Sequence, residues 1–394
     1  MKPDSQGALS HVRVLDLSRV LAGPWASQML GDLGAEVLKI EHPARGDDTR
    51  GWGPPYAMGS DGSPVESAYF LCANRNKKSV AIDMTTAEGQ AALRKLAAEC
   101  DVLIENFKVG SLAKYGLDYD SLSKINPRLI YCSITGFGQT GPYANRPGYD
   151  FMIQGMGGLM SVTGRPDEEE GGGPMKVGVA LTDVLTGLHA VAGILAALAW
   201  RERSGEGQHI DIALLDVQVS CLANQALNYL VTGRSPQRLG NAHPSIVPYE
   251  AFPTADGDMI LAIGNDSQFA SFCEVAGHPQ WATDSRFATN AARVEHRQLL
   301  APMLRKVTVA RTTAEWIELL ERANVPCGPI NTVEQVFADV QVQARHLRVE
   351  LPHPVLGTVP SVASPLRLSK TPVTYRVAPP ALGADTDAVI NERN

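Results

Sequence analysis

One carboxylate in this sequence is a candidate for covalent chemistry. Asp183 lies in the segment GVALTDVLTG (178–187), at the start of an apolar stretch that predicts a long helix over residues 180–201. A carboxylate in the first turn of a helix is stabilised by the helix dipole, so Asp183 could have that structural role alone. A carboxylate can also be a covalent nucleophile. It is too weak to attack an amide, but a thioester is within its reach.

A turn of mostly small residues is a candidate binding site. Residues 18–24, SRVLAGP, follow the apolar run VRVLDL (12–17), which predicts a buried strand. In open α/β sheets, ligands bind outside the carboxyl ends of the strands, and small residues let a ligand approach the backbone. The alternative is a tight turn that binds nothing.

Basic residues in the same part of the chain could bind a polyphosphate. They are Lys39, Arg45, Arg50, Arg75, Lys77, Lys78, Lys108 and Lys114, with the densest cluster at NRNKKS (74–79). The alternative for such scattered residues is a solvated surface.

The glycine motif GFGQTG (136–141) has the spacing of a dinucleotide-binding fingerprint. Such a loop must open directly into a helix, whereas Pro142 and Pro147 follow here. We therefore expect neither a nicotinamide nor a flavin. The sequence has no P-loop motif, and its nine histidines form no zinc-binding pattern, so we expect no metal site.

Alternating apolar strands and helices position these residues. We predict strands at 36–41, 78–84, 101–107 and 129–137, and helices at 22–35 and 85–100. Thr85 and Glu88 fit a capping box at the start of the second helix. This alternation is typical of a parallel sheet with helices on both faces, and so of an α/β fold.

The second half of the chain changes character. A strand at 209–216 and an apolar helix to about 231 precede a hairpin at 249–264, and helices are predicted at 267–277, 293–307 and 312–323. We predict a large domain whose N-terminal part is 1–227, a small α+β domain at 228–330, and a segment at 331–394 that returns to the large domain. The acidic run DEEEGGG (167–173) is a surface loop or a mobile flap.

Composition bounds the partners and the compartment. The 394 residues carry a net charge of −7 with no basic tail, which argues against nonspecific nucleic-acid binding. The N-terminus has no signal-peptide pattern. The most apolar stretch, 190–200, is shorter than a membrane span. Six scattered cysteines indicate reduced thiols, so we expect a cytoplasmic protein with no membrane partner.

Several segments together resemble the family III CoA-transferases, the group of formyl-CoA transferase and carnitine CoA-transferase. They are VLDLSRVLAGPWASQMLGDLGAEVLKIEHPARGDDTRGWGPP (14–55), NRNKKSVAIDM (74–84), DVLIENFKVGSLAKYGLDYDSL (101–122), YCSITGFGQTGPYANRPGYDFMIQGMGGLMSVTG (131–164), VGVALTDVLTGLHAVAGILAAL (177–198) and GQHIDIALLD (207–216). The resemblance implies a Rossmann-like large domain built from both chain ends, an inserted small domain, and an interlocked homodimer.

The resemblance also implies a site, position by position. The catalytic aspartate corresponds to Asp183, and Tyr149 lies in the segment before the catalytic loop. The CoA-contacting residues correspond to Val20, Leu21, Ala22, His42, Ile82, Thr85, Asn106, Lys114 and Tyr149. His42 stands where an arginine is frequent near the adenine, and Arg45 could replace it. The lysine that formyl-CoA transferase has in the Ile82–Thr85 stretch is absent, as is its glycine-rich lid.

The implied reaction moves CoA from an acyl-CoA to a carboxylic acid through a covalent intermediate on Asp183, with CoA thioesters as substrates and no tightly bound cofactor. Backbone N–H groups must stabilise the oxyanions, and Gly155, Gly157 and Gly158 are candidates. Two alternatives are a 2-methylacyl-CoA racemase of the same fold and a catalytically silent CoA-binding protein. A racemase needs an acid/base pair, and Tyr149 stands where such enzymes carry a histidine.

The segment GNAHPSIVPYEAF (240–252) resembles the branch that uses succinyl-CoA as donor and a dicarboxylate as acceptor. We therefore expect a dicarboxylate substrate, with glutarate, hydroxymethylglutarate, citramalate and mesaconate as candidates. His243 could bind the distal carboxylate, and its alternative role is packing within the loop. Tyr149 is the other candidate substrate contact.

Overall fold

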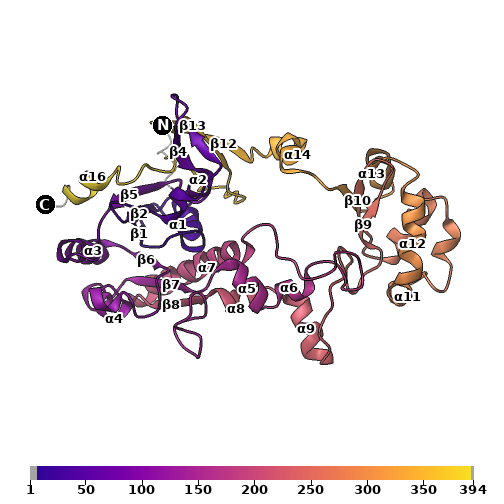
Figure 1. The fold of residues 1–394 in the computed structure, drawn as a ribbon, viewed down its shortest axis with the longest axis horizontal. Coiled ribbons are helices and arrows are strands. Elements are labelled where there is room, and N and C mark those ends of the chain that lie inside the picture. Colours follow the sequence, from indigo (N-terminus) through magenta and orange to yellow (C-terminus); the bar gives the residue numbers. More distant parts are fainter. Residues whose placement is uncertain (1–6, 392–394) are drawn as a thin grey trace. The chain divides into compact units, whose positions relative to one another are not determined.

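The computed structural model describes residues 7–391, which fold as two compact units (Figure 1). The first unit contains the chain up to Leu159, residues Lys176–Leu230, and the chain from Gln341 onward. The second unit contains Met160–Met175 and Val231–Val340. Both chain ends of the described region therefore belong to the unit that carries Asp183.

A six-stranded sheet forms the centre of the first unit. Its strands are β1 (Arg13–Asp16), β2 (Glu36–Glu41), β5 (Lys77–Ala81), β6 (Val102–Glu105), β7 (Ile130–Thr135) and β8 (His209–Ala213). They lie in the order β5-β2-β1-β6-β7-β8, and every neighbouring pair is parallel. The chain winds away from β1 in one direction and from β6 in the other. The strand order therefore reverses between β1 and β6, which is where open α/β sheets bind ligands.

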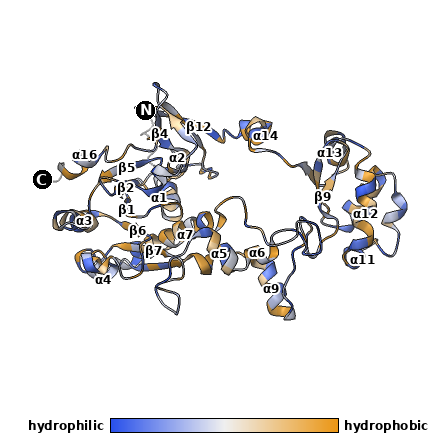
Figure 2. Ribbon diagram, in the orientation of Figure 1, coloured by the Kyte–Doolittle hydropathy of each residue, from blue (hydrophilic) through white to orange (hydrophobic). Residues whose placement is uncertain are grey.

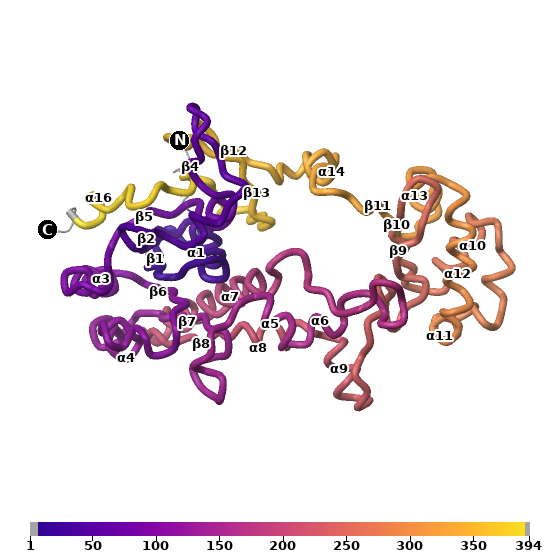
Figure 3. Tube along the Cα trace, viewed as in Figure 1, coloured from indigo at the N-terminus to yellow at the C-terminus, as the bar shows by residue number. Residues whose placement is uncertain are grey.

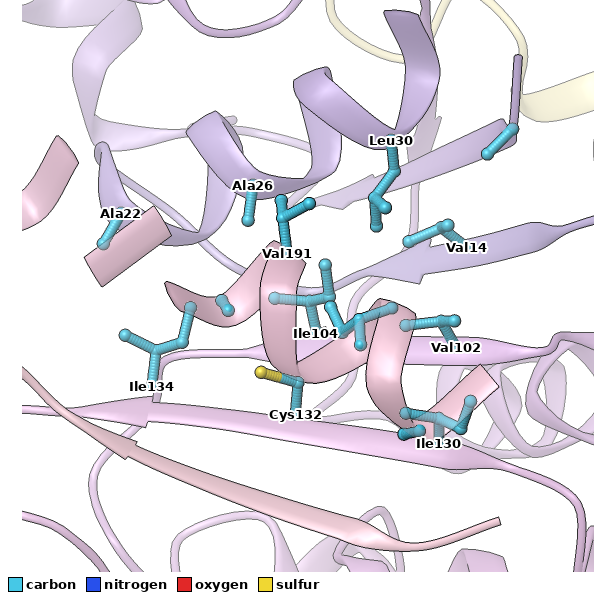
Figure 4. Packing of buried hydrophobic residues seen from close by; sticks show 14 of the residues in the cluster. Val14, Ala22, Ala26, Leu30, Val102, Ile104, Ile130, Cys132, Ile134 and Val191 are labelled. Carbon is cyan, nitrogen blue, oxygen red and sulfur yellow. The ribbon is translucent and has the colours of Figure 1, made fainter. Parts of the chain in front are cut away.

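Helices cover both faces of this sheet because its strands alternate their side chains between two apolar cores. On one face, Val14, Ile104 and Cys132 pack against α1 (Ala22–Asp32) and α7 (Leu181–Ser204), as Figure 4 shows. On the other face, Leu15 and Leu103 pack against α3 (Ala87–Glu99), α4 (Tyr119–Ile125) and α16 (Thr386–Asn391).

Shorter elements complete the first unit. They are the 3-10 turns Asp48–Gly51 and Ala113–Tyr115, the strand pairs β3 (Tyr56–Met58) with β4 (Pro64–Ser67) and β12 (Arg348–His353) with β13 (Gly357–Val362), and helices α2 (Ala68–Cys72), α5 (Asp150–Met156) and α8 (Leu214–Ser220). The C-terminal segment returns to β5 (Figure 3), where the main-chain N–H groups of Ser79 and Ala81 donate to Asp385 and Thr386.

The second unit has its own core. A three-stranded antiparallel sheet is formed by β9 (Tyr249–Pro253), β10 (Asp258–Ala262) and β11 (Cys327–Pro329). Helices α10 (Asp266–Val275), α11 (Asn290–Glu295), α12 (Arg297–Thr308) and α13 (Thr313–Arg322), with the 3-10 turn Pro279–Ala282, bury Phe252, Phe272 and Trp316 against it. Helices α6 (Leu159–Val162), α9 (Ala223–Thr232), α14 (Val333–Ala338) and α15 (Val340–Ala344) lie along the connecting stretches of the chain.

Most predicted elements are confirmed, but the capping box is wrong. The helix begins at Ala87, and its N-cap is Thr86, whose hydroxyl accepts from the N–H of Gly89. The hydroxyl and N–H of Thr85 instead donate to the carboxylate of Asp83, at 2.7 and 2.9 Å. This local turn takes Thr85 out of the helix, because an aspartate side chain competes for backbone donors two residues on.

Among the described residues, α7 is the single helix whose length and hydropathy would suit a membrane span, and 44% of its most apolar window is buried. Figure 2 shows hydrophobic and hydrophilic residues on the helices of both units. The buried residues of α7 include Ala190, Val191 and Ile194, which belong to the core beneath the main sheet. The central helix of a globular protein is buried in the same way. The length and hydropathy of α7 are therefore weak evidence for a membrane span.

Candidate active site

The loops that follow β1 and β6 are joined at the point where the strand order reverses. The side-chain oxygen of Asn106 accepts from the main-chain N–H of Arg19 at 2.9 Å, and its amide nitrogen donates to the Arg19 carbonyl at 2.7 Å. One side chain therefore satisfies both backbone groups of Arg19. Asn106 thereby fixes the residue that precedes Val20, the first residue predicted to contact CoA.

The turn itself has an unusual backbone. Val20 has φ of 72°, a left-handed conformation that is rare for a β-branched residue and is concentrated at functional sites. Helix α1 follows at Ala22, and no side chain caps its N-terminus. The turn thus presents main-chain groups of residues 20–22 rather than a capping side chain.

Asp183 lies in the first turn of α7, next to a second carboxylate. Asp150, the first residue of α5, accepts from the main-chain N–H groups of Thr182 and Asp183, at 2.8 and 3.3 Å. Burial, and secondly the negative charge of Asp150, raise the pKa of Asp183 to about 7. Asp183 is therefore partly ionised at neutral pH, and as a carboxylate it is more basic and a better nucleophile than an ordinary aspartate.

A glycine brings Asp183 close to the turn after β1. Gly187 lies one helical turn after Asp183, and a Cβ at that position would be 2.8 Å from the carbonyl oxygen of Ala22 and 3.1 Å from the side chain of Trp25. Helices α7 and α1 can therefore approach only because residue 187 has no side chain. Sequence analysis missed Gly187, although a glycine inside a long helix is a signal of close packing.

Two clefts open on this part of the first unit. One has a volume of about 300 Å³ and the other about 390 Å³. The first is lined by His42, Arg45, Ile82, Thr85 and Lys114 from the predicted set, and the second by Val20, Leu21, Ala22, Asn106, Tyr149 and Asp183. Arg19, Asp48 and Phe107 line both clefts. Eleven of the predicted positions thus fall into two adjoining clefts, and one of these clefts contains Asp183.

His243 is the predicted site residue that neither cleft includes. It belongs to the second unit, where its ring packs on Tyr249 with centroids 5.4 Å apart. Its Nδ1 accepts from the N–H of Ser245, and its carbonyl accepts from Arg297. These contacts fit the alternative role of His243, which is packing within the loop. Binding of the distal carboxylate by His243 stays a prediction.

Four of the eight basic residues considered as polyphosphate ligands have mostly buried side chains and form ion pairs. For these four, the interpretation as a solvated surface is wrong. Lys39 with Asp47 and Lys77 with Asp16 are ion pairs whose side chains have no exposed surface. Others in this group are Arg75, which pairs with Asp32, and Arg50, which pairs with Glu41 and Glu66. Lys78 is exposed and pairs with Glu36 at 2.8 Å. The cluster NRNKKS is therefore mainly structural.

Three members of that set are available to a ligand. Within residues 7–391, no ion pair involves Arg45, Lys108 or Lys114. Arg45 and Lys114 line the first cleft, and Lys108 lines the second. Lys114 lies over the ring of Tyr115, with its Nζ 4.6 Å from the centroid. An anion entering either cleft would meet a cation that is not already neutralised.

The glycines considered as oxyanion donors lie elsewhere. Gly157 is the C-cap of α5, and a Cβ there would be 2.5 Å from the side chain of Gln218. Gly155, Gly157 and Gly158 are not among the residues that line the two clefts. Across the described part of the chain, no group of three His, Cys, Asp or Glu side chains is placed to hold a metal ion.

Two further residues of this part of the first unit were not predicted. Tyr69 on α2 is half-buried, and burial together with the charge of Asp183 raises its pKa to about 12. Its ring packs edge-on against Trp52, with centroids 5.3 Å apart. Asp47 is the second, and it accepts from the N–H of Val20. No motif marks either residue, because both reach the site through contacts that are distant in sequence.

Comparisons with known proteins identify the family of this chain. The model of CoA-transferase family III matches residues 9–386. A succinate–glutarate CoA-transferase of Agrobacterium fabrum is 53% identical over 390 residues, which cover 99% of this chain and 96% of that protein. A succinyl-CoA:glutarate CoA-transferase of Mus musculus is 45% identical over 389 residues, covering 99% and 87%.

A solved structure shares the fold. The crystal structure of a CAIB/BAIF family protein from Brucella suis superimposes with a TM-score of 0.87 at 48% identity, covering 99% of this chain and 100% of that one. The family match across nearly the whole chain, and the high identity to enzymes of one activity, confirm the resemblance. This chain belongs to CoA-transferase family III and is a CoA-transferase.

Proposed function

We propose that this enzyme moves CoA from succinyl-CoA to a dicarboxylate, with glutarate as the preferred acceptor, through a covalent intermediate on Asp183. The observation that carries the proposal is the half-buried Asp183, with its pKa near 7, in a cleft that adjoins a second cleft lined by unpaired cations. The two relatives named above act on succinate or succinyl-CoA and glutarate, which supports this substrate pair.

The reaction begins when a carboxylate oxygen of Asp183 attacks the thioester carbonyl of succinyl-CoA. The carbon–sulfur bond breaks, and CoA leaves as a thiolate. The thiolate then attacks the aspartyl carbonyl of the mixed anhydride, and succinate leaves. Asp183 now carries CoA as a thioester.

The second half reverses these steps with a different acid. A carboxylate of glutarate attacks the aspartyl thioester, and CoA leaves again as a thiolate, which gives a glutaryl–aspartyl anhydride. The thiolate attacks the glutaryl carbonyl, and the carboxylate of Asp183 is released. The overall reaction exchanges one acyl-CoA thioester for another of similar energy, so the residues of the site need only to position and stabilise the reacting groups.

An acyl-CoA would extend across the two adjoining clefts. We assign the nucleotide end to the first cleft, with its phosphates near Arg45 and Lys114, and the pantetheine and acyl end to the second, with the thioester at Asp183. The shared residues Arg19 and Phe107 support a ligand that passes from one cleft to the other. Main-chain N–H groups at the uncapped start of α1 are the candidate oxyanion donors.

The test is a transfer assay that follows acyl-CoA products by mass. We expect glutaryl-CoA to form from succinyl-CoA and glutarate, and to form faster than the CoA thioester of a monocarboxylate of equal length, such as pentanoate. Asp183→Asn should abolish transfer. Equal efficiency with pentanoate would reject the dicarboxylate, and undiminished transfer by Asp183→Asn would reject the nucleophile.

We further propose that the chain works as an interlocked homodimer in the cytoplasm. Large apolar side chains are exposed on α7 and α9, among them Leu188, Trp200, Leu227 and Leu230, and a partner would remove them from water. All six cysteines are free thiols, as in a reducing compartment. Native mass spectrometry should give twice the mass of the chain, and a monomer at micromolar concentration would contradict the dimer.

A further inference from the structure

A buried carboxylate holds the turn between β1 and α1 in a conformation that the residue there disfavours. A non-glycine residue stays in the left-handed region only where its surroundings keep it there, and Val20, with φ of 72°, is such a residue. The main-chain nitrogen of Val20 lies 3.3 Å from each carboxylate oxygen of Asp47. This contact joins the turn to the loop after β2.

Asp47 is itself firmly held. It accepts from the N–H and the hydroxyl of Thr49, at 3.0 and 2.8 Å, and Lys39 Nζ donates to it at 2.8 Å. Lys39 also donates to the carbonyl of Ser18 at 3.1 Å. The buried pair thus contacts the turn on both sides of Arg19. Burial opposes the charge on Asp47, but Lys39 and Thr49 lower its pKa to about 2, so the acceptor is a carboxylate throughout the working pH range.

The position of this contact matters because it lies between the two clefts. Asp47 lines the first cleft, Val20 lines the second, and Arg19, between Ser18 and Val20, lines both. A change of backbone conformation at Val20 would move the main-chain groups at the point where a ligand passes from one cleft to the other.

We propose that Asp47 is a positioning residue for acyl-CoA, because its buried carboxylate keeps Val20 in the left-handed conformation that shapes the junction of the two clefts. Asp47 acts through the turn and does not touch the reacting atoms. The inference rests on the proposed function, since it takes this turn to contact the CoA thioester. Nothing in it depends on which acid accepts CoA.

The first test combines Asp47→Asn with changes at Val20. Asparagine keeps one acceptor oxygen, but it replaces the other with an NH2 donor and loses the charge that pairs with Lys39, so its hold on Val20 is weaker. The turn should then leave the left-handed conformation more often, and we expect KM for succinyl-CoA to rise about tenfold with a smaller change in kcat, because only the competent fraction binds. Val20→Gly in the same chain should restore much of KM, because glycine adopts this φ without penalty. Val20→Ala is the matched control and should not restore it. Equal recovery with glycine and alanine would overturn the proposal.

A second variant covers the case in which Asp47→Asn leaves Lys39 unpaired and the chain does not fold. Lys39→Met with Asp47→Leu replaces the ion pair by apolar groups of similar size, which proteins tolerate better than one unpaired charge. This double variant should fold, as checked by thermal unfolding, and should still have the raised KM. A folded double variant with the KM of the wild type would overturn the role of Asp47.

The same experiments separate this inference from the proposed function. Wild-type transfer from succinyl-CoA to glutarate is measured first, and its absence rejects the proposed function alone. Binding of free CoA, measured by calorimetry on the full-length protein, then tests Asp47 directly. Weaker CoA binding by Asp47→Asn, restored by Val20→Gly, supports the inference, and unchanged binding contradicts it.

Discussion

The carboxylate of Asp150 accepts a hydrogen bond from the main-chain N–H of Asp183, with a nitrogen–oxygen distance of 3.3 Å. One carboxylate therefore caps the helix whose first turn carries another, and the negative charge of the cap adds to burial in raising the pKa of Asp183 to about 7. The contact both orients α7 at its start and keeps the proposed nucleophile protonated to a higher pH than an ordinary aspartate.

This arrangement predicts the pH dependence of transfer. Asp183 must be ionised to attack, so kcat/KM should fall as the pH drops below about 7. Asp150→Asn keeps an acceptor for the N–H of Thr182 but removes the charge, so the acidic limb should move by about 0.5–1 pH unit to lower pH. Initial rates between pH 5 and 9 measure both profiles. An acidic limb unchanged by Asp150→Asn would contradict the electrostatic role of Asp150.

The same raised pKa predicts how stability depends on pH. Between the ordinary pKa of an aspartate and about 7, the folded protein holds a proton at Asp183 that the unfolded chain has lost, so this group makes folding less favourable as the pH rises through that window. Asp183→Asn removes this cost. It should be more stable than the wild type by about 1–3 kcal/mol at pH 8, with the difference vanishing near pH 4.

Urea unfolding at both pH values measures this difference. Asp216→Asn is the matched control, because Asp216 lies in the first turn of α8 but is exposed. A gain for Asp183→Asn that persists at pH 4, or an equal gain for Asp216→Asn, would show that the effect does not come from burial of the Asp183 carboxylate.

The close approach of α7 to α1 predicts that Gly187 cannot carry a side chain. Gly187→Ala would put a methyl group against the carbonyl of Ala22, and we expect a loss of about 1–3 kcal/mol in stability and at least about tenfold in kcat/KM. Gly193→Ala is the control on the same helix, because its nearest contact would be a side-chain methyl of Ile210 at 3.3 Å. It should keep activity within about twofold. Equal effects of the two substitutions would contradict the packing argument.

Arg45 and Lys114 form no ion pair with any residue that the structure describes and line the first cleft, so replacing them should weaken binding of succinyl-CoA but not of glutarate. Arg45→Ser and Lys114→Ser should each raise KM for succinyl-CoA about fivefold, and less at high salt, while KM for glutarate stays close to the wild-type value. Lys78→Ser is the control, because Lys78 is exposed and pairs with Glu36. An increase in KM for glutarate alone would place the nucleotide elsewhere.

Local patterns in the sequence are sufficient to predict most of the fold. The apolar runs that become β1, β2, β6 and β7 are short and bounded, and the long apolar stretch at α7 contains Asp183 in its first turn. The capping box predicted at Thr85 is wrong because Asp83 accepts from the N–H and the hydroxyl of Thr85, the groups that would form the box.

Pairing between distant residues is what the sequence does not reveal. Lys39, Lys77 and Arg75 look like phosphate ligands when read along the chain, yet each meets a buried aspartate from another strand, helix or loop. For the same reason Asp47 carries no motif, because its importance arises from one contact with Val20. Gly187 is the missed residue that a pattern could have indicated, since a glycine inside a helix costs about 1 kcal/mol relative to alanine.

In the proposed mechanism, Asp183 becomes covalently attached to the acyl group and then to CoA. The direct measurement is mass spectrometry of the intact protein after incubation with succinyl-CoA without an acceptor, followed by hydroxylamine or borohydride treatment and peptide mapping. We expect a modification on the peptide that contains Asp183, and none in Asp183→Ala. An unmodified Asp183 in an enzyme that exchanges solvent deuterium into the α-carbon of a 2-methylacyl-CoA would contradict the account and indicate a racemase.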